Sequence, residues 1–187
     1  DGPLAGQWTY GVYTRDFSGT NQTGTITSGT QQGTGYVDDF DVLALRNTLA
    51  GTAQGTDQND FGVIYQSTLN ITAGGTYTFG VTSDDGSRII IRDSSGNVVF
   101  NLDNDREQGA TTASGTVNLQ AGQTYSIELY YWENTGDTAF GATIAGPGFN
   151  PINLATAPMV GTPPLAAGHV DGNDTLYGGA GADALNG

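Results

Sequence analysis

The feature that most constrains the fold is a long series of short segments in which hydrophobic residues alternate with small polar ones. Such alternation is typical of β-strands that bury one face. The apolar positions are Tyr77, Phe79, Val81, Ile89, Ile91, Val98, Phe100, Leu102, Val117, Leu119, Tyr125, Ile127, Leu129, Tyr131, Phe140, Ala142 and Ile144. Turns separate the segments about every ten residues. The pattern predicts an all-β fold, an antiparallel β-sandwich of the jelly-roll kind.

The N-terminal third carries a weaker pattern. Residues 7–13 alternate and predict a strand, whereas residues 18–35 are rich in Gly, Thr and Gln and predict a loop region. Residues 37–47 contain one apolar run, which fits either a strand or a short helical turn. Residues 61–65 and 69–71 predict two further short strands. We therefore expect this part of the chain to complete the same sandwich.

The charge balance excludes several classes of function. The chain has 19 acidic and five basic residues, for a net charge of −14, which argues against binding nucleic acid or anionic membranes. Such an acidic excess is self-repelling unless cations neutralise it. There is no cysteine, and His169 is the only histidine, so thiolate chemistry and Ser-His-Asp triads are excluded from the main body of the chain. No signal peptide or transmembrane run is visible, and the opening residues 1–3 are typical of an excised fragment.

Two adjacent aspartates, Asp84 and Asp85, lie in a turn between the clearest pair of predicted strands. If successive strands reverse direction, residues 83–87, 103–115 and 133–138 all fall at one pole of the sandwich. These three loops are acidic or rich in oxygen donors. Calcium takes several hard oxygen ligands and tolerates irregular geometry. The sequence therefore predicts a calcium site at this pole.

The C-terminal tail is a separate element. Residues 171–187 match the glycine-rich, aspartate-containing nonapeptide of calcium-binding parallel β-rolls, the RTX type of repeat. The expected calcium ligands, if the roll is extended, are Gly172, Asp174, Gly179, Gly181 and Asp183. We therefore expect a β-sandwich domain over residues 1–160, a proline-containing linker over residues 161–168, and the start of a truncated repeat array over residues 169–187.

The central part of the chain, from about residue 12 to residue 149, resembles the protective-antigen-14 (PA14) domain, a β-sandwich module found in adhesins, toxins and glycosidases. The match is carried by residues 81–92, 96–100, 119–133, 136–140 and 146–148. Combined with the RTX-type tail, this resemblance is typical of a repeat-containing bacterial adhesin.

The resemblance also implies a binding site. The lectin members of the family hold calcium through an Asp-Asp pair joined by a cis peptide, together with a second loop, and vicinal sugar hydroxyls complete the coordination. By position, Asp84 and Asp85 are the pair. In the second loop the first side-chain ligand falls on Glu133, with Asn134 next to it, and Thr135 and Asp137 are the expected sources of further oxygens.

Other residues near the pole have candidate roles in binding that must be weighed against a purely structural role. Gln108 is a candidate sugar contact if its loop folds over the pole. Trp132 is a candidate sugar contact, and packing within the sandwich is an equally good account of it. The acidic residues at positions 103–107 either hold a further ion or form an exposed loop, and we expect the exposed loop. The similar pair at positions 38–39 lacks a strand–turn–strand frame and is expected to be solvated.

The expected function is that of a calcium-dependent lectin module in a large secreted bacterial adhesin, monomeric in isolation, with cell-surface glycans or polysaccharides as partners. Its role would be cell-surface attachment or biofilm formation outside the cell, and no catalytic residue is expected. Consecutive aspartates on one ion are too close for glycoside hydrolysis, which needs carboxyl groups about 5 Å or more apart. The alternatives are a structural or protein-binding spacer made rigid by calcium, or an ancillary domain of a glycoside hydrolase.

Overall fold

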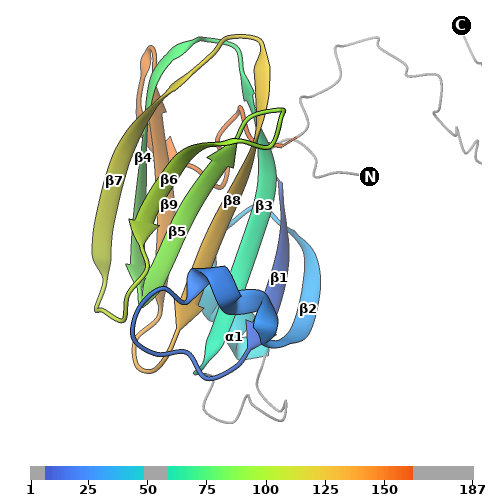
Figure 1. Ribbon diagram of the computed structural model, residues 1–187, viewed down its shortest axis with the longest axis vertical. Coiled ribbons are helices and arrows are strands. Elements are labelled where there is room, and N and C mark those ends of the chain that lie inside the picture. Colours follow the sequence, from blue (N-terminus) through green and yellow to red (C-terminus); the bar gives the residue numbers. More distant parts are fainter. Residues whose placement is uncertain (1–6, 49–58, 162–187) are drawn as a thin grey trace, which may run out of the picture.

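A computed structural model describes residues 7–48 and 59–161 as two antiparallel sheets that face one another (Figure 1). The larger sheet contains β1 (Trp8–Thr14), β2 (Thr30–Val37), β3 (Phe61–Ile71), β5 (Gly86–Arg92), β6 (Val98–Asn104) and β8 (Gln123–Glu133). The smaller sheet contains β4 (Gly75–Asp84), β7 (Thr111–Leu119), β9 (Ala139–Gly146) and β10 (Phe149–Asn153). Two short helices are added: the 3-10 helix η1 (Thr23–Ser28) and α1 (Val42–Thr48).

The strand order explains how the sandwich closes. The larger sheet runs β2-β1-β3-β8-β5-β6, and the smaller sheet runs β10-β9-β4-β7. The alternating hydrophobic residues of both sheets point into the space between them, where Phe79, Ile89 and Leu129 are fully buried. Ile89 and Leu129 lie directly opposite each other on β5 and β8. The predicted antiparallel β-sandwich is confirmed.

The N-terminal third contains more regular structure than its sequence predicts. Residues 18–35, expected to be a loop region, include η1 and most of the edge strand β2. The apolar run at residues 42–45 is helical and belongs to α1. The two short strands expected at 61–65 and 69–71 are one continuous strand, β3. Ser67 interrupts the apolar alternation because its hydroxyl donates a hydrogen bond to the main-chain oxygen of Gln7 at 2.8 Å.

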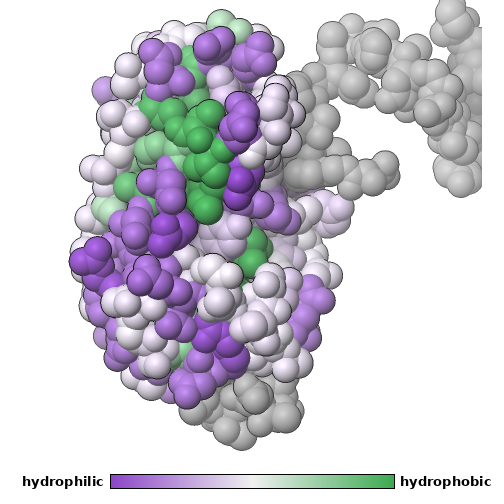
Figure 2. Space-filling view, viewed as in Figure 1, coloured by the Kyte–Doolittle hydropathy of each residue, from purple (hydrophilic) through white to green (hydrophobic). Residues whose placement is uncertain are grey.

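The β4–β5, β6–β7 and β8–β9 connections meet at one end of the sandwich, the lower end in Figure 1. This confirms the predicted pole, and Figure 2 shows that strongly hydrophilic residues gather at the same end. We call this end the acidic pole. The predicted linker beyond Gly161 and the predicted calcium-binding tail, with Gly172, Asp174, Gly179, Gly181 and Asp183, lie outside the described residues. Within the described ranges, no helix has the length and hydrophobicity needed to cross a membrane.

Candidate metal centre

Three carboxylates converge at the acidic pole. β4 ends at Asp84 and β5 begins at Gly86, so the aspartate pair forms the tight connection between them. The peptide bond from Asp84 to Asp85 is cis, as the family resemblance implies. Asp84, Asp85 and Glu133 each place a carboxylate oxygen within 4.8 Å of the others. Asp85 is 4% exposed and Glu133 is fully buried, so two of the three carboxyl groups are shielded from water.

Asp85 holds the three loops of the pole together. One carboxylate oxygen accepts the main-chain N–H of Gln108 at 2.9 Å. The other accepts the main-chain N–H of Asn134, also at 2.9 Å. Hydrogen bonds to a charged carboxylate are the stronger kind. A single side chain on the β4–β5 connection therefore fixes the β6–β7 and β8–β9 connections around the site.

Only one of the two carboxylate oxygens of Glu133 has a hydrogen-bond partner among the described residues. Its Oε2 atom lies 3.0 Å from the hydroxyl of Tyr131, but its buried Oε1 atom has no hydrogen-bond partner among the described residues. Burial raises the pKa of Glu133 to about 8, and the charges of Asp85 and Asp84 add to this, against the opposing influence of the Tyr131 hydrogen bond and Arg46. The pKa of Asp84 is also raised, first by burial and then by Asp85 and Asp137.

This donor set fits a hard divalent cation. All the converging groups are oxygens, the ligands that Ca²⁺ prefers, and a buried carboxylate oxygen with no partner is available to it. Neighbouring carboxylates without a cation raise one another's pKa because like charges disfavour ionisation. Asp84, Asp85 and Glu133 are thus the residues that would hold calcium.

Outside these carboxylates lies an open cavity of about 430 Å³, lined by Asp84, Asp85, Glu107, Gln108, Gly109, Thr135 and Asp137. Thr135 and Asp137 are exposed at its rim. Gln108 is placed at the site as predicted, and its side-chain amide donates to the main-chain oxygens of Asp85 and Asn104. The cavity gives a ligand access to the site from solvent.

Asn134 takes part in the site through its main chain. Its N–H donates to Asp85, and its carbonyl accepts the N–H of Asp60 at 3.1 Å. A metal-ligand role for the Asn134 side chain stays a prediction, as do the main-chain roles expected of Thr135 and Asp137. Arg46, which the sequence analysis missed, holds the same loop by donating to Thr138 Oγ1 at 2.7 Å and to the carbonyl of Gly136 at 3.3 Å.

Trp132 does not face a bound sugar. The side chain is fully buried and forms a small hydrophobic cluster with Phe17 and Ile26. It lies on the outer face of the larger sheet, as its alternation predicts, but η1 and the chain before it cover that face. The prediction of a ligand-contacting Trp132 is therefore wrong, because a strand residue on the outer face meets solvent only where nothing packs over it.

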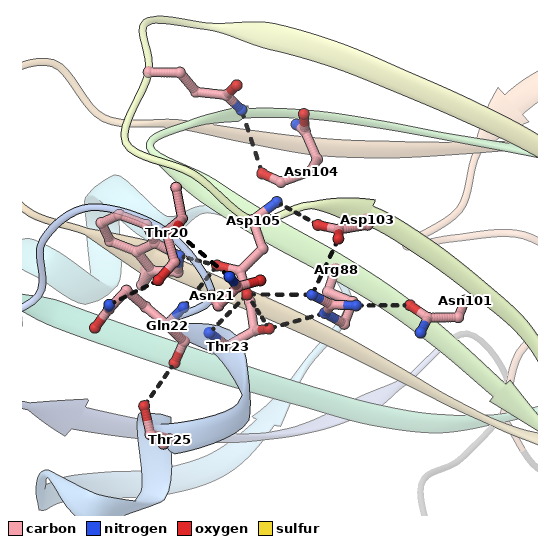
Figure 3. Close-up of polar contacts among 12 residues, drawn as sticks. Thr20, Asn21, Gln22, Thr23, Thr25, Arg88, Asn101, Asp103, Asn104 and Asp105 are labelled. Atoms are coloured by element: carbon pink, nitrogen blue, oxygen red, sulfur yellow. Dashed lines mark hydrogen bonds and ion pairs between the residues drawn. The ribbon is translucent and has the colours of Figure 1, made fainter.

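Asp105, expected in an exposed loop, is the buried centre of a hydrogen-bond network (Figure 3). Its carboxylate accepts the indole N–H of Trp132 at 2.7 Å and the hydroxyl of Thr23 at 2.5 Å. It also accepts the main-chain N–H groups of Gln22 and Thr23, both at 3.0 Å, and it pairs with Arg88 at 3.4 Å. Such a satisfied carboxylate has no open position for an ion. The network instead anchors the β6–β7 connection three residues before Gln108 contacts Asp85.

The fold and the site together define a class: a two-sheet β-sandwich whose loops bring an Asp-Asp pair and a third carboxylate together at one pole. Comparison with known families places the chain within that class. The PA14 domain family matches residues 10–144, so the chain belongs to this family. Among curated proteins, no sequence matches the chain.

Several solved structures share the fold. The PA14 domain of MpAFP antifreeze protein is 22% identical, with a TM-score of 0.61, and the match covers 87% of this chain and 95% of that one. A PA14 sugar-binding domain from an RTX adhesin is 19% identical, with a TM-score of 0.57 and coverage of 81% and 96%. The A domain of epithelial adhesin 6 from Candida glabrata, in complex with Galβ1-3GlcNAc, is 14% identical, with a TM-score of 0.55 and coverage of 86% and 88%.

Proposed function

We propose that this domain is a calcium-dependent lectin module of an extracellular adhesin. The observation that carries the proposal is the convergence of Asp84, Asp85 and Glu133, with an unpartnered buried oxygen on Glu133, beneath a solvent-open cavity. A cation held there would neutralise the three carboxylates and present its outer side to the cavity. Two adjacent sugar hydroxyls are suitable ligands for that side, because calcium accepts six to eight oxygen ligands.

The relatives support the glycan partner. Two structural neighbours are a sugar-binding domain from an RTX adhesin and an adhesin domain bound to a disaccharide. With few polar contacts around one ion, the affinity for a single sugar is expected to be weak, roughly micromolar to millimolar. Attachment to a cell surface or within a biofilm would then depend on many copies that act together. A calcium-responsive RTX-type tail in residues 169–187 belongs to the same proposal.

The first test is binding of the domain to a glycan array, with calcium and again with excess chelator. The sharpest variant is Asp84→Asn, which removes one charge with little change of shape. Asp85 is less suitable for this test because its carboxylate accepts two main-chain N–H groups. Asp38→Asn is the matched control, since it makes the same change in the exposed Asp-Asp pair.

We expect calcium-dependent glycan binding that Asp84→Asn removes and Asp38→Asn leaves intact. The calcium-dependent rise in melting temperature should follow the same pattern. If calcium stabilises the protein but no glycan binds in either condition, the domain is a spacer with a structural ion. If neither calcium response is seen, the metal centre itself is refuted.

A further inference from the structure

A second concave surface lies on the outer face of the larger sheet. One cavity, of about 550 Å³, lies over β5, β8 and β3, and another, of about 420 Å³, lies over β3, β1 and β2. Both are lined by Thr27, Ile64 and Gln66, so the two cavities adjoin, and we call them together the sheet groove. It shares no lining residue with the cavity at the acidic pole.

The strand register shows that the sheet groove runs across the strands. One row of opposed residues along its floor is Arg88, Tyr130, Ile64, Gly11 and Thr34. The next row is Ile90, Glu128, Gln66, Thr9 and Tyr36. The rows cross five strands, from β5 to β2, and with about 4.8 Å between neighbours the floor is about 19 Å long. A chain of several units would fill this length, whereas a single small molecule would not.

One wall of the groove is fixed in place. The wall is η1 and the residues before it, which pack across β1, β3, β5 and β8. Thr23 holds this wall to the sheet because it donates to Asp105 and accepts from Arg88 Nε at 3.0 Å (Figure 3). A groove whose wall is already ordered loses little conformational entropy when a ligand binds. The sheet groove is therefore preorganised.

The floor combines flat apolar surface with amide and hydroxyl groups. Tyr130 and Ile64 provide partly buried apolar surface. Tyr13 lies across Gly11, where an added Cβ would come 3.0 Å from its ring. Tyr36 is 54% exposed at the far end, and Gln66 donates from its amide to Glu128. Aromatic faces beside planar hydrogen-bonding groups are well suited to sugar rings, which have apolar faces and hydroxyl edges.

Both arginines in the groove are paired with carboxylates. Arg88 pairs with Asp103 and Asp105, both at 3.4 Å, and Arg92 lies 3.8 Å from Glu128. A chain with a net charge of −14 also repels polyanions. Recognition of an extended peptide by strand addition needs a free sheet edge. Of the strands that form the floor, all except β2 are paired on both sides, so side chains must provide the contacts.

We propose that the sheet groove binds an extended neutral oligosaccharide or polysaccharide segment, lying across the strands, without calcium. This site goes beyond the proposed lectin site and is separate from it. The domain would then contact a glycan chain at two places, through vicinal hydroxyls at the acidic pole and through several consecutive sugar rings on the sheet face.

The test uses the isotope-labelled full chain in excess chelator, titrated with neutral hexasaccharides of the cello-, xylo-, laminari- and malto- series. Amide NMR signals should shift saturably for Gly11, Thr34 and Gln66, and the hexasaccharide should bind more tightly than the matching disaccharide. The variant is Tyr36→Ala with Gln66→Ala, two exposed positions whose change should not affect folding. Binding should weaken about tenfold or more. The control is Ile152→Ala with Gln120→Ala, also exposed but outside the groove.

The groove variant should keep the full calcium-dependent rise in melting temperature, which distinguishes this site from the lectin site. The proposal is overturned if no member of the panel binds at millimolar concentration. It is equally overturned if the shifts are confined to residues 84–85, 107–109 and 133–137, or if the groove variant binds as well as the control. If peptides bind in the sheet groove and none of the oligosaccharides does, the assignment to glycans is refuted.

Discussion

The hydroxyl of Tyr131 lies 2.7 Å from the main-chain oxygen of Asp84 and donates a hydrogen bond to it. The same hydroxyl lies 3.0 Å from the carboxylate of Glu133, yet a tyrosine hydroxyl has only one hydrogen to donate. A protonated Glu133 satisfies both contacts, because its carboxyl group can donate to the Tyr131 oxygen. With the pKa of Glu133 raised to about 8 by burial, this is the form expected at neutral pH without a cation.

Tyr131→Phe should therefore weaken the metal centre. The substitution leaves the carbonyl of Asp84 without its donor, and a lost buried hydrogen bond costs about 1–2 kcal/mol of unfolding free energy. We also expect a several-fold weaker calcium affinity, because the aspartate pair is less firmly held. Urea unfolding in chelator and a calcium titration measure the two effects. Tyr125→Phe is the matched control, since Tyr125 lies on the same strand as Tyr131 and its hydroxyl accepts the N–H of Gln120; an equal loss of calcium affinity there would contradict the prediction.

The pH dependence of stability without calcium should report on Glu133. Its pKa in the folded state, about 8, lies above its ordinary value of 4.5. Its contribution to stability is thus fully present below about 4.5 and is lost as the pH rises through about 8. Thermal unfolding in chelator across this range should show the decline, and Glu133→Gln, which copies the protonated form, should flatten it. A decline of the same size in Glu133→Gln would assign it to other groups.

Asp105→Asn should destabilise the protein strongly although the residue is not a metal ligand. The change removes the buried partner of Arg88 and turns an amide donor towards groups that are themselves donors, which should cost about 3 kcal/mol. Asp103→Asn is the matched control, because it also faces Arg88 but its side chain is 53% exposed; there we expect less than about 1 kcal/mol. Urea unfolding of both variants measures the two losses of unfolding free energy. A loss for Asp105→Asn no larger than that for Asp103→Asn would contradict the prediction.

Gly86→Ala should disrupt the acidic pole by displacing the side chain of Trp132. A Cβ at this position would lie 2.1 Å from the indole nitrogen of Trp132, so the tryptophan must move away from Asp105. We expect a loss of about 3 kcal/mol in unfolding free energy. Gly33→Ala is the control, since no atom lies within 4 Å of its added Cβ and its effect should be small. Matching unfolding curves for the two variants would contradict the packing argument.

The acidic pole was predictable because strand alternation and reversal of direction are encoded locally. Asp84 and Asp85 fall between two clear strands, and counting strands from there places the later loops at the same end. Glu133 was also within reach: it lies two residues after the inward-facing Tyr131, so both side chains share a face. The convergence of these three residues could therefore be predicted without knowledge of distant contacts.

The layer that covers the outer face was not predictable in the same way. Residues 18–35 contain few hydrophobic residues, so neither η1 nor β2 produces a periodic pattern. Phe17 and Ile26 cover Trp132, but nothing in their local sequence indicates which strand they meet. The prediction of an exposed Trp132 and of an exposed Asp105 failed for this one reason. Arg46 was missed likewise, because its partners lie 90 and 92 residues further along the chain.

The spacing between Asp105 and Gln108 has a consequence for evolution. Asp105 is fixed to η1 and Trp132, and Gln108 is fixed to Asp85, so the two residues between them must span a set distance. In relatives with a longer β6–β7 connection, we expect the added residues after position 108, towards β7. A lineage could thus reshape the rim of the cavity while the three carboxylates of the candidate metal centre stay in place, so that the proposed ligand preference and ion binding would change at different rates.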